Sequence, residues 1–189
     1  MFEDHDEKPP RFLIDIAGMC SGARYLPSPN HDQRLDGDEV ELVILHNISL
    51  PPGEFGGDSI TKLFLNQLDP NAHPYFKDIA GREVSSHFLI RRDGDLLQYV
   101  PCELRAWHAG QSTWQGRERC NDFSVGIELE GTDDVAFEEA QYATLKDLLD
   151  ALFIRYGKLP LTGHSDVSPG RKTDPGPHFD WSRLAHLRD

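Results

Sequence analysis

The stretch with the most chemical potential in this 189-residue chain runs from Gly163 to Pro177. One histidine, two carboxylates and two cations lie in it: His164, Asp166, Arg171, Lys172 and Asp174. The proline after Asp174 favours an extended backbone, and alternate residues of an extended segment share a side, so Lys172 and Asp174 are expected to face the same way. A metal site and a polar turn with an incidental histidine account for this stretch about equally well.

A second histidine tips the balance toward a metal site. His46 ends the aliphatic and β-branched run Val40–Leu45, a pattern that indicates a buried strand. Glu128 and Glu130 lie near the end of a second such run, residues 123–131. Ligands gather at the carboxyl ends of strands in open α/β sheets, so these segments are expected to meet. The candidate metal ligands are His46, His164 and Asp174.

The remaining pattern indicates further strands and helices of an α/β fold. Residues 86–91 and 96–100 are expected to form a hairpin across Arg92–Asp95. In the strand 123–131, the odd-numbered residues from Val125 face one layer, and the two glutamates face the other. The clearest helix covers residues 138–156. Shorter helices are expected from Asp58 to about Leu68 and from Asp180 to Leu187, with an irregular loop over residues 72–83.

A long loop, residues 101–122, carries two tryptophans, a histidine and three arginines. Loops of this length in compact domains are usually functional or disordered. The aromatic and cationic content favours a loop that covers a substrate. The alternative is that Trp107 and Trp114 only anchor the loop to the core.

Composition excludes several classes of protein. The formal net charge of -13 argues against binding to nucleic acid or to anionic membrane surfaces. An anionic ligand stays possible in a pocket that concentrates cations. Cys20, Cys102 and Cys120 form no CxxC motif and predict free thiols in a reducing compartment. No stretch reaches the length of a membrane span. The acidic first seven residues are unlike a secretory signal, and a cytoplasmic protein is expected.

Several short motifs, in this order, resemble the zinc-dependent N-acetylmuramoyl-L-alanine amidases, a family that shares its fold with peptidoglycan recognition proteins. The resemblance covers nearly the whole chain from Pro27 onward and is strongest to a cytoplasmic branch, the 1,6-anhydro-N-acetylmuramyl-L-alanine amidases of cell-wall recycling. The motifs that carry it are Pro27–Asn30, His46–Gly53, Leu68–Asn71, His73–Phe76, Val84–Ile90, Arg105–Gly110, Gly116–Ser124, Gly126–Thr132 and Arg171–Gly176.

The resemblance implies a role for each candidate site residue. It assigns one Zn²⁺ per chain to His46, His164 and Asp174, and it selects Glu128 over Glu130 as the catalytic base. Lys172 is expected to stabilise the oxyanion, with a salt bridge to a carboxylate as the lesser alternative. The expected substrate-binding residues are Asn47, Trp107, His108, Arg119 and Arg171. Asp166 is expected to form a turn, and His87 either points into the cleft or is a satisfied core histidine. His5, His31 and His178 are expected to be solvated.

The fold implied is a single α/β domain with a central mixed β-sheet flanked by helices. Residues 1–24 form a partly flexible N-terminal extension, and residues 25–189 form the zinc amidase domain. The expected reaction is hydrolysis of the amide between 1,6-anhydro-N-acetylmuramic acid and L-alanine in cytosolic anhydromuropeptides. Such a monomeric enzyme would also lower the muropeptides that signal β-lactamase induction. The alternatives are a non-catalytic peptidoglycan-fragment binding protein and a lytic amidase acting on intact murein.

Overall fold

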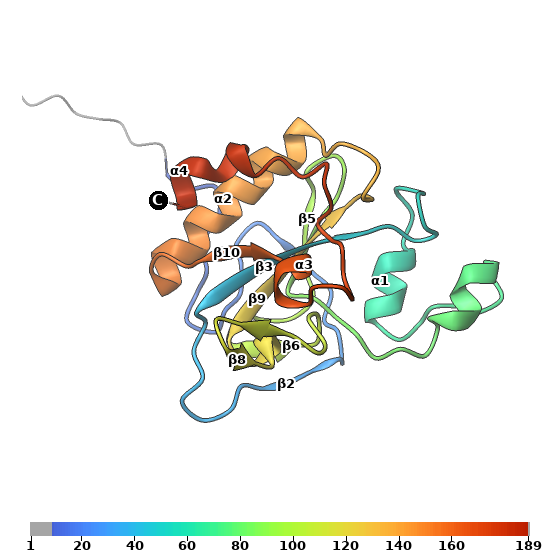
Figure 1. Cartoon of the computed structure of the whole chain (residues 1–189), viewed down its shortest axis with the longest axis horizontal. Coiled ribbons are helices and arrows are strands. Elements are labelled where there is room, and N and C mark those ends of the chain that lie inside the picture. Colours follow the sequence, from blue (N-terminus) through green and yellow to red (C-terminus); the bar gives the residue numbers. More distant parts are fainter. Residues whose placement is uncertain (1–8, 189) are drawn as a thin grey trace, which may run out of the picture.

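The computed structural model describes residues 9–188, which surround one six-stranded mixed sheet (Figure 1). Its strand order is β1-β5-β4-β9-β3-β10, and only the β4–β5 pair is antiparallel. These strands are β1 (Arg24–Tyr25), β3 (Leu42–Ile48), β4 (Phe88–Ile90), β5 (Leu96–Gln98), β9 (Ser124–Glu130) and β10 (Leu161–Gly163). Two small antiparallel pairs join β2 (His31–Gln33) to β6 (Leu104–Ala106) and β7 (Thr113–Trp114) to β8 (Arg117–Glu118).

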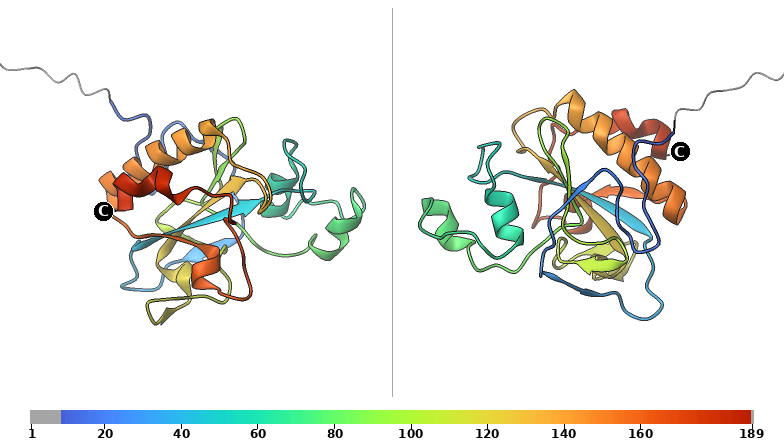
Figure 2. Two further views of the ribbon diagram at one scale, coloured as in Figure 1. Left: turned by 45° about the horizontal axis from the view of Figure 1, so that its top comes forward. Right: turned by 180° about the vertical axis from the view of Figure 1, so that it is seen from behind.

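The two faces of the sheet have different covers, as the views in Figure 2 show. The long helix α2 (Glu139–Tyr156) lies across one face, with the closing turn η3 (Trp181–Leu184) and helix α4 (Ala185–Arg188) beside it. The opposite face is covered by α1 (Ser59–Phe64), η2 (Cys120–Asp122) and α3 (His164–Val167), and η1 (Pro74–Asp78) lies outside α1, farther from the sheet. This division confirms the predicted α/β domain with a central mixed sheet and flanking helices.

The core beneath α2 forms because strand and helix periodicities present apolar side chains to one another. Val125, Ile127 and Leu129 of β9 pack in one cluster with helix residues that include Leu145 and Leu149. Glu138 and Gln141 form a capping box that starts the helix, and Gly157 ends it at a backbone φ of 80°. The predicted facing of β9 and the predicted helix 138–156 are both confirmed.

The segment before β1 packs onto the same core. Phe12, Ile14 and Cys20 are buried, and Gln98 accepts the backbone N–H of Cys20 at 2.9 Å. The predicted looseness of the first ten residues falls mostly on positions outside the described range. Cys20, Cys102 and Cys120 are all buried free thiols, as predicted. Within residues 9–188, no helix has the length and apolar character needed to cross a membrane.

Outside the strands of the central sheet, three predictions of local structure were wrong. The helix after Asp58 ends at Phe64 rather than near Leu68, because Asn66 adopts a left-handed φ of 58° that breaks the helical path. The expected loop 72–83 contains the 3₁₀ turn η1, which starts at a proline and is capped by the ring of His73. The long loop 101–122 contains β6, β7, β8 and η2 instead of irregular chain.

Candidate metal centre

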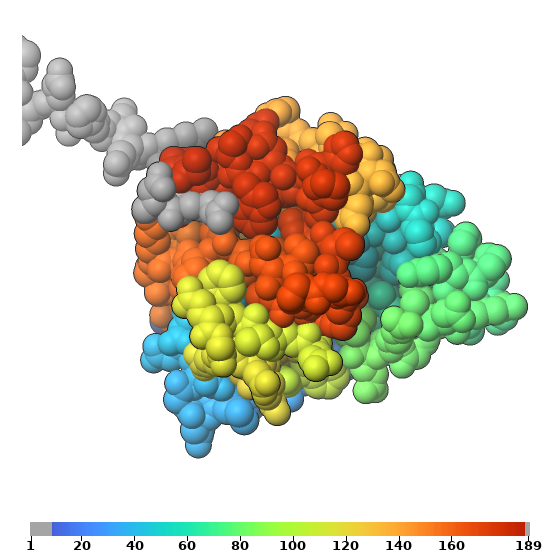
Figure 3. Space-filling model, in the orientation of Figure 1, coloured from blue at the N-terminus to red at the C-terminus, as the bar shows by residue number. Residues whose placement is uncertain are grey.

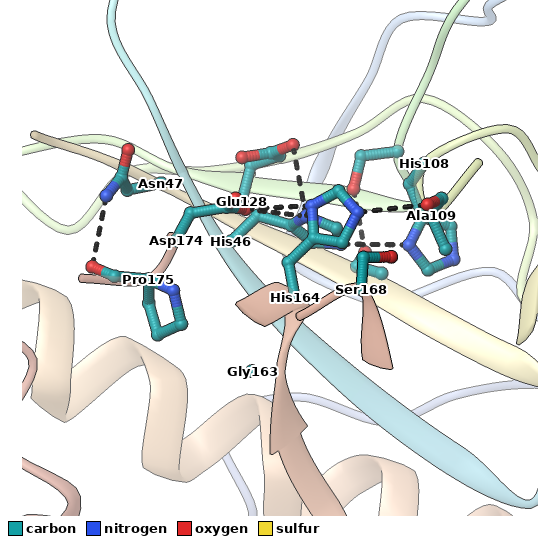
Figure 4. Close-up of polar contacts among 12 residues, drawn as sticks. His46, Asn47, His108, Ala109, Glu128, Gly163, His164, Ser168, Asp174 and Pro175 are labelled. Atoms are coloured by element: carbon teal, nitrogen blue, oxygen red, sulfur yellow. Dashed lines mark hydrogen bonds and ion pairs between the residues drawn. The ribbon is translucent and has the colours of Figure 1, made fainter. Parts of the chain in front are cut away.

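Three segments far apart in sequence bring two imidazoles and a carboxylate together on the face opposite α2 (Figure 4). His46 Nδ1 lies 3.0 Å from His164 Nδ1 and 3.0 Å from Asp174 Oδ2, and the latter two atoms are 3.1 Å apart. We call His46, His164 and Asp174 the ligand triad. A tetrahedral zinc with bonds of about 2.0–2.1 Å needs donor atoms about 3.4 Å apart, so the triad needs little adjustment to hold one.

The elements that carry the triad explain its position. The strand β3 was predicted to stop at Leu45, but it continues to Ile48 because its ladder with β9 runs that far. His46 therefore lies inside the strand, on the face opposite Leu45. His164 begins α3 directly after the edge strand β10, which pairs with β3. Asp174 lies in the loop after α3, and its carbonyl accepts the backbone N–H of Ser165 at 2.9 Å.

The charge state of the triad suits a cation. Burial lowers the pKa of His46 below its usual value, more than Asp174 raises it. Burial alone would raise the pKa of Asp174, but hydrogen bonds with His164 and His46 reverse this and hold it below its usual range. The triad therefore combines a neutral imidazole at His46 with an ionised carboxylate. Metal ligation needs donors in these protonation states.

Glu128 lies next to the triad because β9 pairs with β3 in a register that places it opposite His46. Its Oε1 is 3.9 Å from His46 Nδ1, and its buried Oε2 has no hydrogen-bond partner among the described residues. Burial and the nearby Asp174 raise the pKa of Glu128 well above its usual value, and Lys172 opposes this. A carboxylate with a raised pKa can accept and return a proton near neutral pH.

Lys172 faces the same cleft, two residues before Asp174. In the part of the chain that the structure describes, no ion pair forms at its ammonium. The lesser alternative raised by the sequence, a structural salt bridge, is therefore not formed here. Its charge stays available to a ligand in the cleft.

The cleft has a volume of about 800 Å³ and a polar and an apolar end. The ligand triad, Glu128 and Lys172 lie at the polar end. The other end is lined by apolar side chains with a tyrosine and an arginine: Leu63, Phe64, Tyr75, Ile79, Arg82 and Val84. In Figure 3 a recess separates the orange surface around residues 165–175 from the teal and green surface of α1 and η1.

Four of the five predicted substrate-binding residues line this cleft: Asn47, Trp107, His108 and Arg171. Each already has protein partners. Trp107 donates its indole N–H to Asp32 at 3.2 Å. Arg171 donates to the carbonyls of Ala109 and Gln111 at 2.6 and 2.8 Å. The fifth residue, Arg119, does not line the cleft, because its guanidinium pairs with Asp122 and its side chain is 64% exposed.

Asn47 has a partner that the sequence analysis missed. Its Nδ2 donates to Asp133 Oδ1 at 2.7 Å and to the carbonyl of Pro175 at 3.0 Å. Asp133 Oδ2 also accepts the hydroxyl of Thr173 at 2.5 Å. Asp133 thus ties β3 to the loop that carries Asp174. Its position just after β9, at the carboxyl end of that strand, is the signal that would have pointed to it.

The other polar candidates have structural roles. Asp166 accepts the backbone N–H of Gly163 at 3.0 Å and forms the predicted turn. His87 is a satisfied core residue: its Nε2 lies 2.9 Å from the carbonyl of Leu104, and Gly126 N–H donates to its Nδ1 at 3.0 Å. Burial lowers the pKa of His87 to about 3. Glu130 pairs with Arg91, as expected of a structural carboxylate. His178 is exposed and His31 half-buried, while His5 lies outside the described residues.

Known proteins are similar to this chain over nearly its whole length. The chain is 57% identical over 177 residues to 1,6-anhydro-N-acetylmuramyl-L-alanine amidase AmpD of Citrobacter freundii, covering 93% of this chain and 94% of that protein. It is 46% identical to the Haemophilus influenzae protein of the same name, covering 92% and 96%.

Solved structures are similar as well. A crystal structure of a selenomethionine AmpD derivative matches with a TM-score of 0.90 and 56% identity, covering 94% of this chain and 99% of that one. AmpDh3 from Pseudomonas aeruginosa, in complex with anhydromuramic pentapeptide, matches with a TM-score of 0.60 and 29% identity, covering 78% and 59%. The family described as N-acetylmuramoyl-L-alanine amidase matches residues 36–177. As its motifs predicted, this chain belongs to the N-acetylmuramoyl-L-alanine amidase family of enzymes.

Proposed function

We propose that this chain is a zinc amidase of peptidoglycan recycling. It hydrolyses the amide that joins the lactyl group of 1,6-anhydro-N-acetylmuramic acid to L-alanine. The observation that carries the proposal is the ligand triad with Glu128 beside it, in a chain 57% identical over nearly its full length to a 1,6-anhydro-N-acetylmuramyl-L-alanine amidase.

The donor set supports zinc as the cation, one per chain. Two imidazole nitrogens and one carboxylate oxygen are the ligands of many catalytic zinc sites, which leave the fourth position to water. Both histidines present Nδ1 to the triad, and their other ring nitrogens have hydrogen-bond partners that hold them in place. When bound, the zinc ion acidifies a water molecule and polarises the scissile carbonyl.

Glu128 and Lys172 supply the rest of the chemistry. Glu128 takes the proton of the attacking water and passes it to the leaving amine of L-alanine. Its raised pKa and its buried Oε2, which has no hydrogen-bond partner among residues 9–188, support this role. Lys172 donates to the oxyanion of the tetrahedral intermediate, because its ammonium lies in the lining of the same cleft.

The substrate occupies the cleft across the triad. Asn47 contributes its Oδ1, because Nδ2 is held by Asp133 and Pro175, and Oδ1 accepts the N–H of a substrate amide. Trp107 offers a ring face to the sugar. Lys172 and Arg171 are the cations nearest the triad on the Asp174 loop, and they attract the carboxylates of the stem peptide. Arg119 has no contact with the cleft that would support its predicted part in this binding.

The cellular setting follows from the substrate. Anhydromuropeptides are expected in the cytoplasm, so the enzyme acts there. It acts as a monomer, without nucleic acid or membrane partners. By removing them it lowers the signal for β-lactamase induction.

The test is turnover of anhydromuramyl-tripeptide by wild-type protein, after chelation, and after zinc is added back, with intact murein sacculi assayed in parallel. Zinc-restored release of the free tripeptide from the soluble substrate is the expected result. Turnover by metal-free protein would refute the zinc site. Faster release from sacculi would show a lytic amidase, and stoichiometric zinc binding without turnover of either substrate would show a binding protein.

A further inference from the structure

His108 lies directly against the ligand triad (Figure 4). Both of its ring nitrogens have hydrogen-bond partners. Its Nδ1 is 2.9 Å from His46 Nε2, and its Nε2 is 3.1 Å from the hydroxyl of Ser124. The rings of His46 and His108 meet edge to face with centroids 5.0 Å apart. His108 therefore contacts the ring nitrogen of His46 that faces away from the triad.

When His46 binds a cation through Nδ1, only one arrangement of the ring protons on His46 and His108 satisfies their hydrogen bond. His46 must present the lone pair of Nδ1, so its ring proton sits on Nε2. That proton can be donated only to an unprotonated Nδ1 of His108, so the proton of His108 sits on Nε2. Ser124 Oγ then accepts it, because a hydroxyl rotates to suit its partner.

The second histidine of the triad is held in a different way. His164 Nε2 lies 2.9 Å from the carbonyl oxygen of Ala109, an acceptor that cannot change tautomer. His108 and Ala109 are neighbours, and Asn121 Oδ1 accepts both of their backbone N–H groups, at 3.1 and 2.8 Å. One two-residue segment thus supplies the acceptors for both histidine ligands, and a single amide side chain fixes it.

Strand β9 has a glycine, Gly126, where it passes the His108 ring. A Cβ at Gly126 would lie 2.5 Å from both Cγ and Nδ1 of His108, so no larger residue fits there without moving the ring. Gly126 is itself held at both ends, since it donates its N–H to His87 and accepts the hydroxyl of Ser86 at 2.9 Å. The ring position of His108 is therefore set by the sheet as well as by its hydrogen bonds.

We propose that His108 is a positioning residue of the metal centre rather than a substrate contact. It accepts the Nε2–H of His46 and so orients Nδ1 of that ring toward His164 and Asp174. This inference rests on the proposed zinc site, and its effect is on zinc affinity. Partners of this kind typically change metal affinity by about 10- to 100-fold.

The experiment compares wild type with three variants: His108→Leu, His108→Asn and Ser124→Ala. The zinc dissociation constant is measured by competition with a chromophoric chelator, and the Co²⁺ absorption spectrum reports coordination. His108→Leu removes the acceptor and is expected to weaken zinc binding by about 10- to 100-fold and to alter the Co²⁺ spectrum. His108→Asn places an amide oxygen near the Nδ1 position and is expected to recover most of the affinity. Ser124→Ala is expected to cost less than tenfold.

Steady-state kinetics at saturating zinc distinguish a positioning role of His108 from a substrate contact. A positioning residue leaves KM for anhydromuramyl-tripeptide within about twofold of wild type once zinc is saturating. An unchanged zinc dissociation constant with a raised KM in His108→Leu would return His108 to the substrate site and overturn the proposal. Equal loss of zinc affinity in the Leu and Asn variants would also overturn it, because the acceptor would then not matter. Absence of zinc binding by wild type would refute the proposed function itself.

Discussion

The two faces of the central sheet are formed by alternate residues of the same strands, yet the ligand triad and Glu128 lie on only one of them. Leu45 and Ile127 point into the apolar cluster beneath α2. The next residues along each strand, His46 and Glu128, point into the cleft. Neighbours in one strand thus belong to opposite environments, because strand side chains alternate.

This difference shows that one face of the sheet mainly stabilises the fold and the other carries the chemical groups of the site. The α2 face gains free energy from burial of apolar area and contains no ionisable group of the site. The cleft face buries a carboxylate oxygen that has no hydrogen-bond partner in the described part of the chain. It also buries imidazoles of lowered pKa, and each of these groups costs stability. Substitutions on the two faces should therefore separate activity from stability.

The largest effect on activity is expected from Glu128→Gln on the cleft face. The amide keeps the shape but cannot take a proton, so kcat should fall by about 10²- to 10⁴-fold. The free energy of unfolding of the metal-free protein at pH 7.5 should stay equal or rise, because a buried carboxylate is replaced by a neutral group. Steady-state kinetics and urea unfolding measure these two quantities, and zinc content is the control that the variant still binds the metal. A stability loss as large as that of a core truncation would erase the contrast between the faces.

The opposite result is expected from Leu149→Ala on the α2 face. This side chain is fully buried in the core cluster, and its truncation should cost about 2–5 kcal/mol of unfolding free energy. Well below the midpoint of thermal unfolding, kcat/KM should remain within about twofold of wild type. Leu149→Met, which nearly conserves volume, is the control and should cost under about 1.5 kcal/mol. A large fall in kcat/KM of folded Leu149→Ala protein would mean that the α2 core also tunes the site.

Much of the fold and the triad could be predicted from local sequence pattern. The helix 138–156 is revealed by its apolar stripe, and β9 by its β-branched alternation. The candidate ligands are chemically distinctive residues at the end of a strand or in a proline-bounded loop, and family resemblance selected them. The helix and strand patterns depend on residues close together in sequence, whereas the grouping of the three ligands was predicted from the resemblance.

What local sequence could not indicate are contacts between segments distant in sequence. The side-chain types of Asn47 and Arg171 indicate a capacity to bind substrate, which stays a prediction, but they do not indicate the protein partners that both side chains have in the fold. Asp133 contacts Thr173 across 40 residues, and Asn47 contacts the Pro175 carbonyl across 128. Arg119 forms an ion pair with Asp122, and its backbone is left-handed at a φ of 62°. Local composition indicates neither feature.

A buried histidine on the cleft face makes stability depend on pH. The pKa of His87 is about 3 in the folded protein and near 6.5 when unfolded. The unfolded chain therefore binds more protons below pH 6.5, and stability falls as the pH drops toward 3. Between pH 7.5 and 5 this group alone should remove about 2 kcal/mol from the unfolding free energy.

The comparison variant for this effect is His87→Asn, which keeps an acceptor for the Gly126 N–H but cannot titrate. Urea unfolding of the metal-free wild type and variant at pH 7.5 and pH 5 gives, for each protein, the loss of unfolding free energy between the two pH values. The variant should be less stable at pH 7.5 yet lose about 2 kcal/mol less on acidification. Equal losses in both proteins would assign the acid sensitivity to other groups of the cleft face.

The smallest effect is expected from Thr173→Val at the edge of the cleft. The change keeps the shape but removes the hydroxyl that Asp133 accepts beside Asp174. A hydrogen bond to a charged group contributes about 1.5–3 kcal/mol when buried and less at this exposed position. A looser Asp174 loop should therefore weaken zinc binding by about three- to tenfold. Thr173→Ser, which keeps the hydroxyl, should bind zinc like wild type. Equal zinc affinity of Thr173→Val and Thr173→Ser would mean that the Thr173 hydroxyl does not position Asp174. The contacts of Asn47, on strand β3, would then be the ones that hold the Asp174 loop in place.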